Sequence, residues 1–91
     1  MLEPHRRRID ALDLELLALL SQRARVALQI AEAKARAGLP VVDPDRERQV
    51  VARLQARNPG PLSDAALARV YAAIMAEMRA LQWGGDPPKG G

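Results

Sequence analysis

Between Pro4 and Gly38 the chain contains neither glycine nor proline, and this long uninterrupted stretch limits the fold more than any other feature. It is rich in strong helix formers and carries apolar residues at helical spacing, including Ile9, Leu16 and Leu20. We predict one helix here, roughly 50 Å long at 1.5 Å per residue. Such a helix exceeds the width of a domain of 91 residues, so we expect it to pack along a partner subunit.

Two further helices are predicted after the stop signal Gly-Leu-Pro at 38–40. Asp43 is a suitable N-cap, Pro44 suits the first helical position, and apolar residues recur at helical spacing to about Arg57. A turn rich in proline follows, after which Ser63 can cap a third helix. The apolar stripe predicted for this helix consists of Leu67, Val70, Tyr71, Ile74, Met78 and Leu81. The sequence therefore predicts an all-α fold with one long, one short and one medium helix.

The third helix is expected to end at Trp83, so we place the helical domain at 1–83 and a disordered C-terminal tail at 84–91. The tail is polar and rich in proline and glycine, which favours disorder. The chain has no cysteine and one histidine, so we expect no disulfide and no metal site. The charged N-terminus and the lack of a long apolar run predict a cytoplasmic protein that does not enter a membrane.

Several charged residues occupy an apolar stripe of the first helix. Steps of four and three residues from Ile9 reach Asp13, Arg23 and Lys34, and one step back reaches Arg6. A single long cation on such a stripe usually extends to water or pairs with a carboxylate. Arg23 and Lys34 return to nearly the same face, roughly 16 Å apart. We predict that they converge on one small anion, such as a dicarboxylate or a phosphate.

The start of the second helix carries Asp43, Arg46 and Glu47 within about one turn. The ordinary interpretation is a cap, a solvated arginine and an acid favoured by the helix dipole. Gln82, at the end of the third helix, offers one acceptor and two donors, and it indicates nothing by itself.

Taken in order, four segments resemble the all-helical class of chorismate mutases, a domain also found fused to prephenate dehydratase, prephenate dehydrogenase or a sugar-phosphate aldol synthase. These segments are Arg6-Arg-Arg-Ile-Asp-Ala-Leu-Asp13, Leu16-Leu-Ala-Leu-Leu-Ser-Gln-Arg23, Ile30-Ala-Glu-Ala-Lys34 and Pro40-Val-Val-Asp43-Pro-Asp-Arg46-Glu47-Arg48. The resemblance covers about residues 5 to 82. It implies an intertwined homodimer with two equivalent sites, each completed by Arg6 of the other chain.

The resemblance also implies an isomerase that rearranges chorismate to prephenate in phenylalanine and tyrosine biosynthesis, without a cofactor. Arg23 and the partner-derived Arg6 would hold carboxylates, and Lys34 and Gln82 would donate hydrogen bonds to the ether oxygen. The implied catalytic residues are Lys34, Gln82, Arg23 and Glu47, and the implied substrate-binding residues are Arg6, Arg23, Asp43, Arg46 and Met78. Related sequences often carry a small polar residue where this chain has Met78, which predicts weaker substrate binding.

Other functions remain open. An isochorismate pyruvate lyase uses inward cations on the same fold, although its relatives tend to lack the Asp43-Pro-Asp-Arg46-Glu47 run. A basic helical interaction module could bind RNA through residues 6–8, but only Tyr71 and Trp83 are aromatic, and acids are interspersed with the bases. We therefore expect no nucleic-acid partner. The domain could also regulate, or form a complex with, another shikimate-pathway enzyme.

Overall fold

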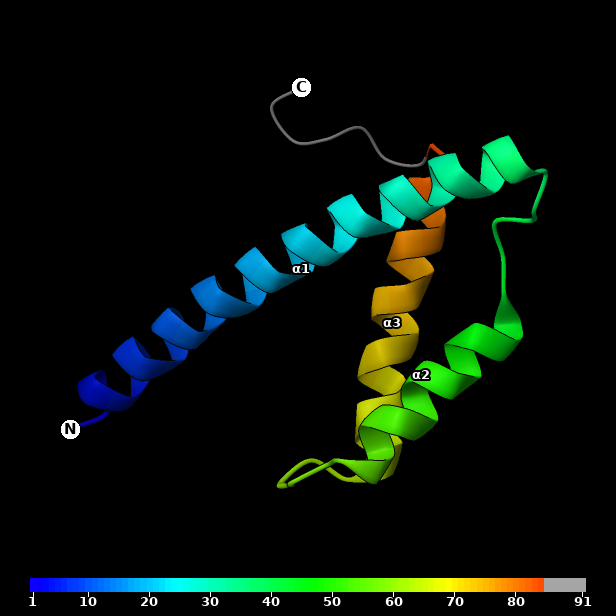
Figure 1. The fold of residues 1–91 in the computed structure, drawn as a ribbon. Coiled ribbons are helices and arrows are strands. Elements are labelled where there is room, and N and C mark those ends of the chain that lie inside the picture. The colour runs from blue at the N-terminus through cyan, green and yellow to red at the C-terminus, as the bar shows by residue number, and fades with distance from the viewer. Residues whose placement is uncertain (85–91) are drawn as a thin grey trace.

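The computed structural model describes residues 1–84, which form three α-helices (Figure 1). Helix α1 spans Glu3–Ala37, α2 spans Pro44–Ala56 and α3 spans Asp64–Gln82. The predicted all-α fold with one long, one short and one medium helix is confirmed. The predicted disordered tail, apart from Gly84, lies outside the described residues.

The helix ends follow the capping signals of the sequence. Gly38 takes a left-handed conformation with φ 69°, and Leu39 N donates to the carbonyl of Lys34 at 2.8 Å. The Asp43 carboxylate accepts a hydrogen bond from the backbone N–H of Arg46, and the Ser63 hydroxyl accepts one from that of Ala66. These local contacts fix where the chain turns, and therefore which side chains the three helices bring together.

Helix α3 packs against both other helices, and Figure 1 shows it crossing the C-terminal half of α1. The N-terminal half of α1 extends away from α2 and α3 (Figure 1). The chain measures 55 × 36 × 15 Å along its principal axes, so it is long and thin. Half of the longest helix has no neighbour to cover it within the described chain.

The core of the single chain is very small. Among residues 1–84 only Ala27 and Met75 are buried hydrophobic residues, with exposed fractions of 6% and 5%. The apolar stripe of α1 stays exposed, and Leu16 and Leu17 remain 57% and 60% accessible. The chain exposes 7495 Å², against roughly 5200 Å² for a compact monomer of its mass. Large apolar side chains exposed together along one helix are typical of a surface that a partner covers.

Candidate active site

A cavity of about 280 Å³ lies where the three helices approach one another. Its lining combines charged and amide side chains with aliphatic ones. The lining residues are Arg23, Val26, Ala27, Ile30, Lys34, Val41, Asp43, Arg46, Glu47, Val50, Met75, Met78, Arg79 and Gln82. We call this the cationic cavity, because four of these residues are arginine or lysine and two are acidic. It brings together seven of the eight predicted site residues, and Arg6 is the exception.

Helix α1 supplies the two cations that the stripe predicts on one face. Arg23 and Lys34 are both half-buried and both line the cavity. Lys34 Nζ donates to the carbonyl oxygen of Val41 at 3.2 Å, across the turn that Gly38 begins. An ammonium group has three donors, so this contact orients Lys34 and leaves two N–H groups for a ligand.

The first turn of α2 supplies Asp43, Arg46 and Glu47. One carboxylate oxygen of Asp43 accepts from Arg46 N at 3.1 Å, so the capping interpretation holds and does not remove the residue from the cavity. Glu47 is half-buried, whereas Asp43 and Arg46 are exposed. Of these three side chains, Glu47 is therefore the one most withdrawn from water.

Helix α3 supplies Gln82, whose amide Nε2 donates to the carbonyl of Ala27 at 2.8 Å. This contact ties the last turn of α3 to the middle of α1, and it leaves the second N–H of the amide for a ligand. Met78 lies one turn earlier and also lines the cavity, with a thioether that cannot donate a hydrogen bond.

The sequence analysis missed Arg79. Its guanidinium Nη1 donates to Glu47 Oε1 at 2.5 Å, and both side chains line the cavity. The predicted stripe of α3 ran through Ile74, Met78 and Leu81. Arg79 lies on a second row with steps of four and three, Met75, Arg79 and Gln82, which includes the most buried residue of the helix. The only sequence signal for Arg79 was its spacing of three residues from Gln82.

Arg6 lies outside the cationic cavity of its own chain. It is exposed, and it pairs with Glu3 at 3.4 Å. Arg6 and Arg23 are separated by roughly 25 Å along the α1 axis, farther than an arginine side chain reaches.

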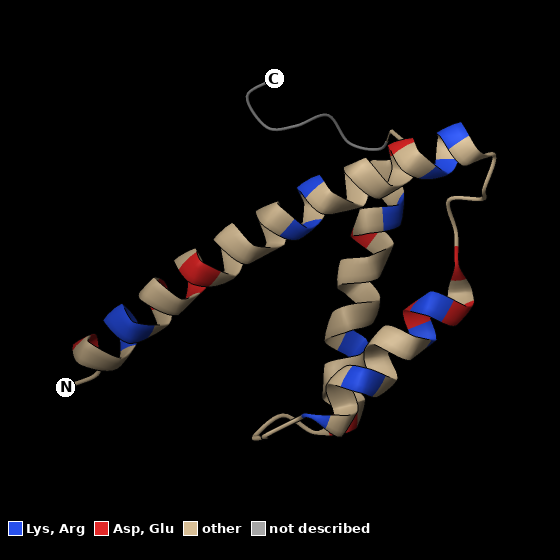
Figure 2. Cartoon of the chain, in the orientation of Figure 1, with Lys and Arg blue, Asp and Glu red and all other residues tan. Residues whose placement is uncertain are grey.

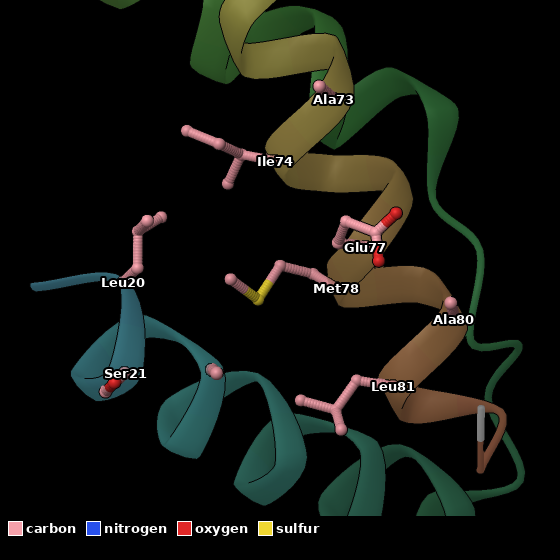
Figure 3. A pocket seen from close by; sticks show the side chains of 9 residues that line it. Leu20, Ser21, Ala73, Ile74, Glu77, Met78, Ala80 and Leu81 are labelled. Atoms are coloured by element: carbon pink, nitrogen blue, oxygen red, sulfur yellow. The ribbon is translucent and has the colours of Figure 1, made fainter. Parts of the chain in front are cut away.

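A second cavity of about 450 Å³ lies between α1 and α3 and is mostly apolar (Figure 3). Figure 3 shows Ile74, Met78 and Leu81 extending from α3 toward the space beside Leu20 of α1. The remaining lining residues are Ser21, Ala24, Ala73, Glu77 and Ala80. We call this the apolar pocket. Met78 lines both cavities, so one side chain separates the polar site from an apolar surface.

The charges elsewhere are mixed. Figure 2 shows basic and acidic residues interspersed along the helices, which differs from the continuous basic patch of a nucleic-acid-binding surface.

Within residues 1–84 no helix is long and apolar enough to cross a membrane. The same residues contain no group of three or more His, Cys, Asp or Glu side chains that could hold a metal ion. The fold and the cationic cavity together define an all-helical domain whose helices surround one cavity lined by four cations and two acids.

The comparison with known proteins gives the family. Residues 5–83 match the model of chorismate mutase type II. The chain therefore belongs to the chorismate mutase type II family, and it carries an isomerase domain, as the sequence predicts. The solved chorismate mutase of Thermus thermophilus, form II, superimposes with a TM-score of 0.90 at 32% identity, covering 94% of this chain and 98% of that one.

Two curated relatives have similar sequences. The bifunctional chorismate mutase/prephenate dehydratase of Neisseria gonorrhoeae is 42% identical over 82 residues, covering 90% of this chain and 22% of the relative. The chorismate mutase of Methanocaldococcus jannaschii is 36% identical over 50 residues, covering 55% of this chain and 50% of the relative. The chain thus spans about a fifth of the length of the bifunctional relatives.

Proposed function

We propose that this chain rearranges chorismate to prephenate, the isomerisation named by its family, and does so by positioning and electrostatic stabilisation. The observation that carries the proposal is the convergence of Arg23, Lys34, Glu47 and Gln82 from three helices on one cavity. Chorismate is a flexible dicarboxylate of single-ring size. A cavity of about 280 Å³, near the lower end for ligand pockets, suits a metabolite of this size.

The reaction breaks the ether C–O bond and forms a C–C bond within the same molecule, so no external nucleophile or redox partner is needed. Arg23 binds a carboxylate and helps to hold the enolpyruvyl arm over the ring. Negative charge develops on the ether oxygen as its bond breaks. Lys34 and Gln82 donate hydrogen bonds there, and preorganised donors of this kind contribute on the order of 3 kcal/mol each in other enzymes.

The ring hydroxyl is received at the start of α2. In this proposal Glu47 accepts its hydrogen bond, and Asp43 and Arg46 from the same helix end also line the cavity, where Arg46 contributes a further positive charge. Met78 provides an apolar wall in place of a polar contact, which weakens substrate binding without removing the groups at the ether oxygen.

We infer that the working form is an intertwined homodimer in which Arg6 enters the cationic cavity of the other chain. Three observations support this inference: the exposed leucines of α1, the apolar pocket beside them, and the distance of Arg6 from its own cavity. In a two-fold symmetric dimer the same exchange occurs twice, which gives two equivalent sites.

We place the activity in cytoplasmic phenylalanine and tyrosine biosynthesis. The bifunctional relatives combine chorismate mutase with prephenate dehydratase in their names, so an enzyme that consumes prephenate is the partner we propose for any complex.

The test is a direct assay with purified protein and chorismate, which follows the loss of ultraviolet absorbance and converts prephenate to phenylpyruvate with acid. We expect turnover that falls by about 10²- to 10³-fold in Lys34→Ala, because a donor to the ether oxygen is lost. Arg36→Ala, an exposed cation in the last turn of the same helix, is the matched control and should keep its activity. If the wild-type protein does not convert chorismate but releases pyruvate from isochorismate, the proposed mutase activity is wrong and the chain is an isochorismate pyruvate lyase.

A further inference from the structure

The ion pair between Arg79 and Glu47 is the only one in residues 1–84 that joins two helices. It connects the last turn of α3 to the first turn of α2, with Arg79 Nη1 at 2.5 Å from Glu47 Oε1. The two side chains are 35% and 30% exposed, so both are largely withdrawn from water. The position of Glu47 within the cationic cavity is therefore set by a residue on another helix.

The ion pair separates the cations of the cavity into one that is paired with a carboxylate and three that are not. Within the described chain Arg23, Lys34 and Arg46 form no ion pair, whereas Arg79 is occupied by Glu47. A carboxylate without Arg79 would attract one of the other cations and withdraw it from an anionic substrate. Only Oε1 of Glu47 is engaged by Arg79, so Oε2 is left to accept a hydrogen bond.

We propose that Arg79 is a positioning residue, which holds Glu47 for the substrate hydroxyl and keeps Arg23 and Arg46 available for carboxylates. The inference rests on the role of Glu47 in the proposed function. Arg79 contacts Glu47 and does not need to contact the substrate. Supporting side chains of this type fix a functional group within the narrow geometry that binding requires.

The rival explanation is that the ion pair only stabilises the packing of α2 against α3, a role that we call a clamp. Kinetic measurements distinguish a clamp from a positioning residue. Arg79→Met removes the charge while keeping an aliphatic side chain. We expect KM for chorismate to rise about tenfold with little change in kcat, because a contact made equally in ground and transition states is lost. Arg79→Lys keeps a point charge and should stay within about threefold of wild type. The matched control is Arg69→Met, an exposed arginine on α3, which should leave KM unchanged.

The decisive measurement repeats Arg79→Met in a Glu47→Gln background. If Arg79 acts through Glu47, its effect on KM should shrink to less than about twofold there. Effects that multiply would overturn the proposal, because Arg79 would then act on something else. A lowered unfolding temperature with wild-type KM, or loss of folding in both Arg79→Met and Arg79→Lys, would identify a clamp and also overturn it. A wild-type protein with no chorismate turnover would instead refute the proposed function, and this inference with it.

Discussion

Met78 occupies the boundary between the cationic cavity and the apolar pocket, and the two sides place different demands on it. Toward the apolar pocket its side chain extends between those of Ile74 and Leu81 (Figure 3). Toward the cationic cavity it offers a substrate no hydrogen-bond donor. A polar residue at position 78 should therefore improve substrate binding, and it should also reduce apolar packing.

Met78→Ser should therefore change binding and stability in opposite directions. We expect KM for chorismate to fall roughly threefold to tenfold, because a hydroxyl adds one hydrogen bond. The free energy of unfolding should drop by about 1 to 2 kcal/mol, since part of a half-buried side chain is removed. Steady-state kinetics and urea unfolding check the two effects. Met78→Leu is the control that keeps apolar packing, and equal KM values in Met78→Ser and Met78→Leu would argue against a substrate contact here.

Gln82→Glu gives a second prediction, with a defined pH dependence. The amide of Gln82 donates at every pH between 5 and 8, whereas a carboxyl group donates only when protonated. Because the ordinary pKa of glutamate is about 4.3, Gln82→Glu should be most active at low pH and should lose kcat as pH rises. In the wild-type protein, residue 82 should not make kcat depend on pH. The measurement is kcat from pH 4.5 to 8 for both proteins, and parallel profiles would show that residue 82 does not donate in the transition state.

A site residue could be predicted when its own helix shows that it is unusual. Lys34 and Arg23 interrupt an apolar stripe, and a periodic pattern displays that conflict directly. Arg79 does not stand out, because its meaning comes from Glu47, which lies 32 positions away on another helix. A contact between helices depends on their crossing, and the sequence of one helix does not contain that geometry.

At the scale of the helices, the ends were the most predictable features. Capping is a contact between neighbours in sequence, so Asp43, Ser63 and Gly38 mark the boundaries that the structure has. The lateral packing was less predictable, since the predicted stripe of α3 omitted Met75, the residue buried between helices. Amphipathic periodicity identifies apolar faces, but it does not say which neighbour covers each face.

Gly38→Ala tests the connection between α1 and α2. Gly38 has φ 69°, and a Cβ there meets nothing within 4 Å, so the cost is one of backbone conformation alone. We expect a loss of about 1 to 2 kcal/mol in unfolding free energy, with Gly38→Asn losing less because asparagine tolerates this conformation. Turnover should also fall in Gly38→Ala, because the turn places the Val41 carbonyl that orients Lys34. Equal stability of the two variants would contradict the conformational explanation.

At the scale of the molecule, the single chain looks like half of a larger structure. A chain 15 Å thick with two buried hydrophobic residues among those described has too little core for independent stability. The apolar stripe of α1 and the apolar pocket can both be covered by a second α1. In the proposed dimer the same exchange would carry Arg6 beyond its own chain, so stability and catalysis would both depend on one interface.

A mixing experiment tests this dependence. Arg6→Ala and Lys34→Ala should each be nearly inactive alone, since each dimer then lacks one group in both sites. If Arg6 is lent across the interface, a hybrid dimer contains one intact site, formed by Lys34 of one chain and Arg6 of the other. Unfolding and refolding the two variants together should restore about one quarter of wild-type activity, because half of the dimers are hybrids with one of two sites repaired. Refolding each variant separately before mixing is the control. Absence of any recovery, with hybrid dimers verified by mass, would mean that Arg6 acts within its own chain or not at all.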